Sequence, residues 1–148
     1  MSQLKVKTPC VGLCSTIYGD LVCRGCKRYH QEIIDWNAYD IEQRDAVIKR
    51  LEFLLVPLVK AHVEVTNIDL LKSQLEKRQI RFLAEQSPYC WVYALLMRGA
   101  AHIRHLNAYG LRLRDSAINT DLVTLRDYLD KEYFAQAEAW LMAHTNNK

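Results

Sequence analysis

The sequence contains no apolar run that approaches the roughly 20 residues needed to cross a bilayer. Its first residues, MSQLKVK, carry basic side chains, but the apolar segment of a secretory signal does not follow them. We therefore expect a cytoplasmic chain with no membrane segment. Because that compartment keeps thiols reduced, a disulfide framework is disfavoured for its cysteines.

A large net charge, internal repeats and low-complexity segments are also missing. The formal charge is +3 at pH 7 over 148 residues, which is too small to imply a nucleic-acid partner. Half of the residues are apolar and a quarter are charged, as in an ordinary soluble domain with a core of useful size.

No nucleophile–base pair, glycine-rich phosphate loop or carboxylate dyad stands out in the sequence. The sequence therefore leaves enzymatic activity undecided and favours a protein without one.

Cysteine, by contrast, is concentrated in one stretch, TPCVGLCSTIYGDLVCRGCKRYH, which holds Cys10, Cys14, Cys23 and Cys26. Two close pairs joined by a short connection can surround one ion, because each pair forms a tight turn whose backbone amides point at the sulfurs. Residues that favour strands flank Gly19 and predict a short hairpin that brings the pairs together. We expect one four-thiolate centre.

The residues beside the second pair fit such a centre. Four thiolates around a divalent ion leave a charge of about −2, which Arg24, Lys27 and Arg28 would offset. Gly25 lies inside the Cys23–Cys26 pair, where the chain must turn tightly.

Other interpretations of the cysteines remain open. They can be incidental buried thiols, or Cys23 and Cys26 can form a redox pair, although no βαβ setting follows them. His30 can replace one ligand. Spacing alone favours zinc, because an iron–sulfur cluster is larger and its better-known ligand runs differ from this one.

The segments TPCVGLC, GDLVCRGCKR and EIIDW together resemble the small bacterial family catalogued as domain-of-unknown-function family 1289, often labelled predicted iron–sulfur proteins. The matching positions are Cys10, Cys14, Cys23, Gly25, Cys26, Arg28 and Trp36. The resemblance implies metal or iron–sulfur cluster binding through the four cysteines. It is silent on the chain from about Ala61 onward.

After the cysteine segment the sequence predicts helices. Their expected starts are Asp40, Asn67, Ser87-Pro88 and Asn119-Thr120, each with a capping residue before an apolar pattern. The first should kink or end at Pro57, the second should reach Leu83 and the third should end near Gly110. We expect a mainly α fold: a cysteine-rich metal-binding module (1–39) followed by a bundle of about four helices (40–148).

A basic run without acids contains Arg98, Arg104, Arg112 and Arg114. It is a candidate polyanion-binding face, or else a solvated helix surface neutralised by its neighbours. Cys90, among large apolar residues, should be a buried small hydrophobe.

Three functions follow from these features: a non-enzymatic adaptor for an unknown protein partner, an iron–sulfur redox or cluster-delivery protein, and, with least support, an RNA- or DNA-binding protein. Nothing in the sequence indicates an oligomeric state.

Overall fold

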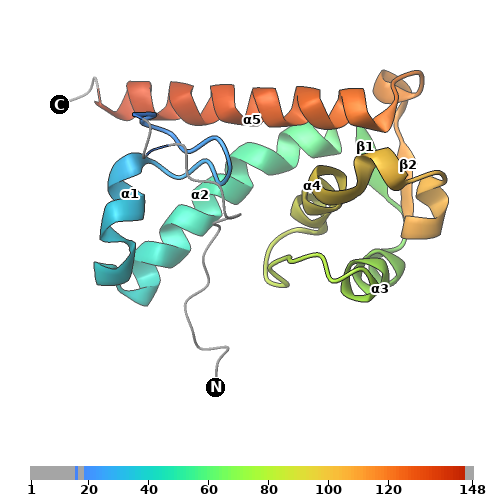
Figure 1. Ribbon diagram of the computed structural model, residues 1–148, viewed down its shortest axis with the longest axis horizontal. Helices are drawn as coiled ribbons and strands as arrows, with labels where there is room; N and C mark the ends of the chain where they lie inside the picture. The colour runs from blue at the N-terminus through green and yellow to red at the C-terminus, as the bar shows by residue number, and fades with distance from the viewer. Residues whose placement is uncertain (1–15, 17–18, 146–148) are drawn as a thin grey trace. The chain divides into compact units, whose positions relative to one another are not determined.

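The computed structural model describes residue 16 and residues 19–145, and this part of the chain is mainly helical, as expected (Figure 1). Its helices and strands are α1 (His30–Asp35), α2 (Ile41–Lys60), β1 (Val63–Val65), α3 (Ile68–Lys77), α4 (Pro88–Gly99), β2 (Leu111–Leu113) and α5 (Leu122–Thr145). Short 3₁₀ turns, η3 (Trp36–Ala38), η4 (Ala100–His102), η5 (Leu106–Tyr109) and η6 (Asp115–Ala117), connect them. None of the helices in this part is long and apolar enough to cross a membrane.

The chain forms two compact units. The first unit comprises Met1–Leu51 and Tyr133–Lys148, and the second unit comprises Glu52–Glu132. Helices α2 and α5 each contribute one part to each unit. The division expected from the sequence, a metal-binding module (1–39) and a helical domain (40–148), is a different one, defined by metal binding, and it stays a prediction.

The first unit contains the predicted start of α2. The Gln43 backbone N–H donates to Asp40 Oδ1 at 2.8 Å, and the Asp40 N–H donates to Gln43 Oε1 at 2.9 Å. This reciprocal pair satisfies backbone donors that the first turn of a helix leaves unpaired. The apolar face that follows, Val47, Ile48 and Leu51, is buried.

Helix α2 does not end at Pro57. It continues to Lys60, and the Ala61 N–H donates to the Pro57 carbonyl at 3.1 Å. Proline removes one helix hydrogen bond and crowds the preceding turn, but here only one turn remains beyond it. Leu55 and Val59, on either side of the proline, are buried, and this burial offsets the lost bond.

The other helix starts follow capping residues. Asn67 Oδ1 accepts a backbone N–H at 3.0 Å, and Ser87 Oγ accepts one at 3.2 Å. Helix α5 is capped by Asp121, whose Oδ1 accepts a backbone N–H at 2.9 Å, so it begins just beyond the predicted Asn119–Thr120. Cap signals are local, and this is why the starts could be predicted.

The expected end of the second helix at Leu83 is wrong, because α3 stops earlier in a left-handed cap. Gln79 has φ 58°, its N–H donates to the Glu76 carbonyl at 3.1 Å, and the Ile80 N–H donates to the Leu75 carbonyl at 2.9 Å. These two bonds form a Schellman motif, which turns the chain back and packs the residue after the cap onto the helix. Ile80 is accordingly buried.

The third helix is also shorter than expected. Helix α4 ends at Gly99, where φ is −138° and ψ is 9°, and the 3₁₀ turns η4 and η5 replace its predicted continuation to Gly110. The chain then enters β2, which pairs antiparallel with β1 in the register Val63↔Leu113, Glu64↔Arg112 and Val65↔Leu111. Strands of three residues are too short to produce a periodic signal, so the sequence did not predict this sheet.

The second unit has its own apolar core, to which its helices and strands contribute. The buried side chains include Leu71, Leu75, Val92, Leu95, Leu96, Leu111, Leu125 and Leu129. Gly110 is required beside this core. Its φ is 71°, and its carbonyl accepts N–H groups from Thr66 at 2.7 Å and Asn67 at 3.1 Å. A Cβ at this position would collide with the Asn67 carbonyl oxygen.

We predict that Gly110→Ala lowers the free energy of unfolding by about 2–4 kcal/mol, because alanine adds both left-handed strain and this collision. Gly99→Ala is the matched control, since a Cβ there meets no atom within 4 Å. It should change stability by less than about 1 kcal/mol. Urea unfolding of the two variants measures the difference, and equal midpoints would contradict the requirement for glycine at position 110.

Candidate metal centre

Half of the predicted ligand set lies in the described part of the chain. Cys23 and Cys26 are buried, with 0% and 6% of their surface exposed. Cys10 and Cys14 lie outside the described residues. Among the described residues, no three His, Cys, Asp or Glu side chains come together as a metal site, so His30 does not complete one with Cys23 and Cys26.

The Cys23–Cys26 pair lies at the tip of a short antiparallel turn. Val22 and Tyr29, which flank this turn in sequence, form an antiparallel β-bridge. The Cys23 N–H donates to the Arg28 carbonyl at 2.9 Å, and the Lys27 N–H donates to the Cys23 carbonyl at 2.8 Å. These bonds tie the residues after the second cysteine to the first cysteine. We call residues 22–29 the knuckle.

Lys27 closes the knuckle in a conformation that is uncommon for a residue with a side chain. Its φ is 66°, in the left-handed region. Its side chain is fully buried, and its Nζ donates to the carbonyl of Arg24 and, at 3.4 Å, to that of Gly25. Nζ also lies 5.3 Å from the centre of the Tyr133 ring. The lysine therefore holds the turn between the two cysteines by its backbone and by its ammonium group.

Hydrogen bonds converge on the Cys26 sulfur. Arg28 Nε donates to Cys26 Sγ at 3.3 Å. Burial raises the pKa of the Cys26 thiol, whereas the side-chain and backbone hydrogen bonds from Arg28 and its positive charge lower it. The neighbouring Cys23 thiol raises this pKa further, because two thiolates repel each other. A thiolate at Cys26 therefore has donors ready, but it also needs a second source of positive charge.

Arg28 is a buried cation, with 4% of its surface exposed. Its guanidinium lies 4.8 Å from the centre of the Trp36 ring, and it forms no ion pair with a carboxylate among the described residues. Trp36 is itself buried and lies beside Tyr39, with ring centres 6.1 Å apart. The knuckle thus packs onto η3, just before α2, through the contact between the Arg28 guanidinium and the Trp36 ring.

Arg24 behaves differently from the two buried cations. Its side chain is 67% exposed, and its Nε lies 3.4 Å from Asp20 Oδ2. The guanidinium also lies 4.4 Å from the centre of the Phe134 ring. Arg24 therefore lies at the surface of the knuckle, with a carboxylate partner of its own.

A partly buried ion pair contacts the knuckle at Tyr29. Arg50 on α2 and Glu32 on α1 form two hydrogen bonds, of 2.5 and 2.8 Å, and each side chain is 13% exposed. Glu32 Oε1 also accepts the Tyr29 N–H at 2.9 Å, and the Arg50 guanidinium lies 4.1 Å from the centre of the Tyr29 ring. Burial raises the pKa of Tyr29 to about 12.

Sequence reasoning did not identify this ion pair. The available signal was an arginine between Val47 and Leu51 on the apolar face of α2, where a cation requires a partner.

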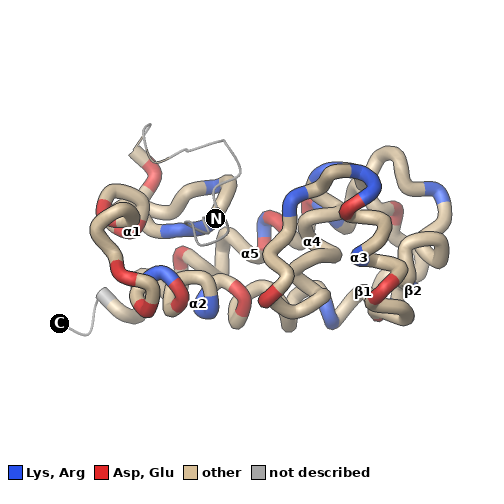
Figure 2. Tube along the Cα trace, turned by 90° about the horizontal axis from the view of Figure 1, so that it is seen from below, with Lys and Arg blue, Asp and Glu red and all other residues tan. Residues whose placement is uncertain are grey.

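The predicted basic run does not form one continuous surface of free cations. Arg112 pairs with Glu64 on the neighbouring strand, and Arg114 Nε donates to the Lys60 carbonyl at 2.6 Å. Arg98 and Arg104 are exposed. Figure 2 shows Lys and Arg segments interleaved with Asp and Glu segments along the chain. The polyanion-binding role of these four arginines stays a prediction.

Cys90 is buried with 7% of its surface exposed, as predicted. Burial raises the pKa of its thiol to about 12. A thiol with this pKa is almost entirely protonated at neutral pH and is a poor nucleophile and a poor ligand. Cys90 therefore differs from Cys26, whose hydrogen bonds from Arg28 oppose the effect of burial on the thiol pKa.

Comparison with known proteins gives one match. No curated protein and no solved structure matches the chain. Residues 8–54, the segment with the four cysteines and the start of α2, match a family model. The N-terminal third of the chain thus has the sequence pattern of the family described as Protein of unknown function (DUF1289), in agreement with the resemblance found in the sequence.

Proposed function

We propose that this chain is a metal-binding adaptor protein without enzymatic activity, in which one four-thiolate centre stabilises the N-terminal segment for binding to a protein partner. Cys10, Cys14, Cys23 and Cys26 would hold the metal. A centre closed by four protein ligands leaves no open position for a substrate, which is typical of structural zinc sites.

The burial of Arg28 is the observation that carries this proposal. A buried charge is costly unless another charge or several hydrogen bonds compensate it. Among the described residues, Arg28 has the Cys26 sulfur and the Trp36 ring beside it and no carboxylate. Thiolates held by a metal would supply the missing negative charge, since four of them leave about −2 around a divalent ion.

The knuckle itself also fits a metal ligand pair. Its two sulfurs are buried, its turn is closed by backbone bonds, and a donor points at one sulfur. Metal-binding cysteines need such donors because the ligand is the thiolate. The bound ion would cross-link a segment that is too short to bury a sufficient core alone.

An iron–sulfur protein for redox chemistry or cluster delivery is the second candidate. The hydrogen bond from Arg28 Nε to Cys26 Sγ favours it, because hydrogen bonds to the sulfurs and burial are the features by which proteins tune cluster potentials.

Metal analysis and an absorption spectrum of untagged protein purified without oxygen separate the candidates. One zinc per chain without visible absorption supports the structural centre. Iron with acid-labile sulfide and a broad band near about 400 nm supports the cluster. Protein that is folded, carries no metal and takes up neither zinc nor iron contradicts both.

We predict that Cys23→Ser and Cys26→Ser each lose the bound metal, because a hydroxyl does not replace a thiolate ligand. Cys90→Ser is the matched control and should retain the wild-type metal content, since Cys90 is a protonated, buried thiol. Metal content per chain is measured by elemental analysis. Wild-type metal content in Cys23→Ser would refute the proposed ligand set.

A second prediction concerns the charge beside the sulfur. Arg28→Met should weaken metal retention against a chelator by about 10–100-fold, because it removes the sulfur's hydrogen-bond donor and the neighbouring charge. Arg24→Met also removes a cation next to a knuckle cysteine, but Arg24 is exposed and has Asp20 as its partner. It should change retention by less than about threefold. Equal effects of the two substitutions would show that Arg28 has no special role.

A further inference from the structure

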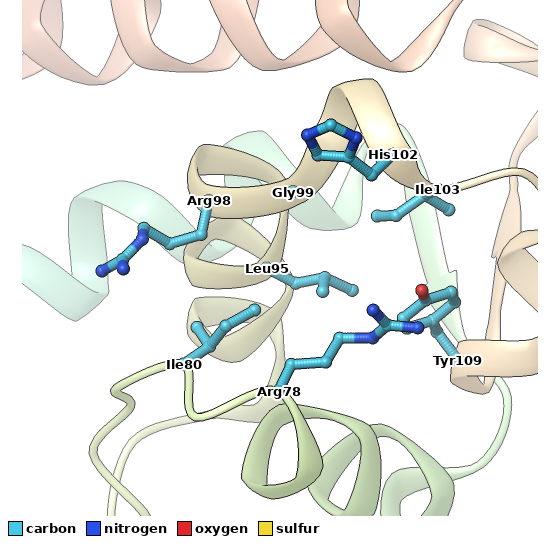
Figure 3. A pocket seen from close by; sticks show the side chains of 8 residues that line it. All are labelled: Arg78, Ile80, Leu95, Arg98, Gly99, His102, Ile103 and Tyr109. Carbon is cyan, nitrogen blue, oxygen red and sulfur yellow. The ribbon is translucent and has the colours of Figure 1, made fainter.

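The second unit contains a pocket that the metal centre does not explain. It is open to solvent on one side and has a volume of about 240 Å³. Its lining residues come from the ends of α3 and α4 and from the turns η4 and η5, all within the second unit (Figure 3); they are Arg78, Ile80, Leu95, Arg98, Gly99, His102, Ile103 and Tyr109.

The backbone explains why these residues meet. Leu95, Arg98, Gly99 and His102 follow a spacing of three, four and seven residues, so they lie along one side of α4 and its continuation. The left-handed cap of α3 places Ile80 against this side.

The pocket combines an apolar floor with a basic rim. Leu95, Ile80 and Tyr109 are buried, with 1%, 9% and 6% of their surfaces exposed. Arg78 and His102 at the rim are exposed. No acidic residue lines the pocket, and within the described residues neither Arg78 nor His102 has an ion pair with a carboxylate.

Arg78 is the rim cation that has an aromatic neighbour in the pocket lining. Its guanidinium lies 5.0 Å from the centre of the Tyr109 ring, and Figure 3 shows the two side chains next to each other. This contact restrains the arginine, and its N–H groups remain able to donate hydrogen bonds to a carboxylate or phosphate group. The Arg98 side chain extends away from the other labelled side chains in Figure 3, so Arg98 is the weaker candidate.

We infer that this pocket binds a small organic anion, whose carboxylate or phosphate group pairs with Arg78 and whose apolar part lies on Ile80 and Leu95. Planar guanidinium groups pair with both acids through two parallel hydrogen bonds. The pocket is smaller than the roughly 300–1,000 Å³ of sites for drug-sized ligands, which favours a ligand with one ring or a short chain.

The test uses the full chain with isotope-labelled isoleucine methyl groups, observed by NMR at low salt. The probes are benzoate and phenyl phosphate, with benzyl alcohol as the neutral analogue and inorganic phosphate as the anion without an apolar part. At least one aromatic anion should shift the methyl signals of Ile80 and Ile103 and bind about tenfold more tightly than either comparison probe. Tighter binding of benzoate assigns a carboxylate ligand, and tighter binding of phenyl phosphate assigns a phosphate ester.

Three variants locate the binding. Arg78→Gln should weaken it by about tenfold or more. Arg112→Gln removes the same charge from the same unit but outside the pocket, and it should change affinity by less than about twofold. Gly99→Met should abolish binding without loss of folding, because a Cβ there meets no atom within 4 Å and the flexible side chain can enter the pocket.

The inference fails if neither aromatic anion shifts the two methyl signals, or if benzyl alcohol binds as tightly as the anions do. It also fails if Arg78→Gln and Arg112→Gln weaken binding equally, since the interaction would then depend only on total charge. Thermal unfolding confirms that each variant is folded before its affinity is compared.

Discussion

Two positive charges are buried directly after the second cysteine of the knuckle, and much of the first unit is arranged around them. Lys27 donates to carbonyl groups of the turn, and Arg28 donates to the Cys26 sulfur. Each cation also lies over an aromatic ring, Tyr133 for Lys27 and Trp36 for Arg28. Rings and carbonyls compensate a cation only in part. In the proposed centre, metal-bound thiolates would supply the negative charge that these cations still lack.

Much of the local structure could be predicted from the sequence. Helix starts depend on one capping side chain and its nearest backbone donors, so Asp40, Asn67 and Ser87 were sufficient to place them. The turn between Cys23 and Cys26 is equally local. The ends of the helices were harder to predict. Proline is a breaker in general, but only one turn of α2 remains beyond Pro57, and the left-handed residue that ends α3 is a glutamine rather than the usual glycine.

Other missed features depend on residues that are distant in sequence. The two strands pair through Val63 and Leu113 across intervening helices, and Arg50 meets Glu32 from another helix. The arginines are also grouped differently in the fold than along the sequence. The sequence grouped Arg98 with Arg112 because no acid separates them, whereas the fold gives Arg112 a carboxylate partner from β1. It brings Arg78, which lies outside the basic run, to the pocket that Arg98 lines. Charge grouped along a chain is a weak guide to charge grouped in space.

The match to the family model ends within α2, whereas the first unit also includes Tyr133–Lys148. Residues 8–54 contain the four clustered cysteines and both buried cations, whereas three partners of this segment come from the middle of α5. Tyr133 lies beside Lys27, Phe134 beside Arg24, and the Ala137 carbonyl accepts the Tyr29 hydroxyl at 3.4 Å. Tyr133 and Ala137 are themselves buried. In this chain the C-terminal helix therefore supplies part of the surface that buries the knuckle, and residues 8–54 alone would leave Lys27 without its aromatic neighbour. The chain beyond the family match thus has a structural role at the candidate metal centre.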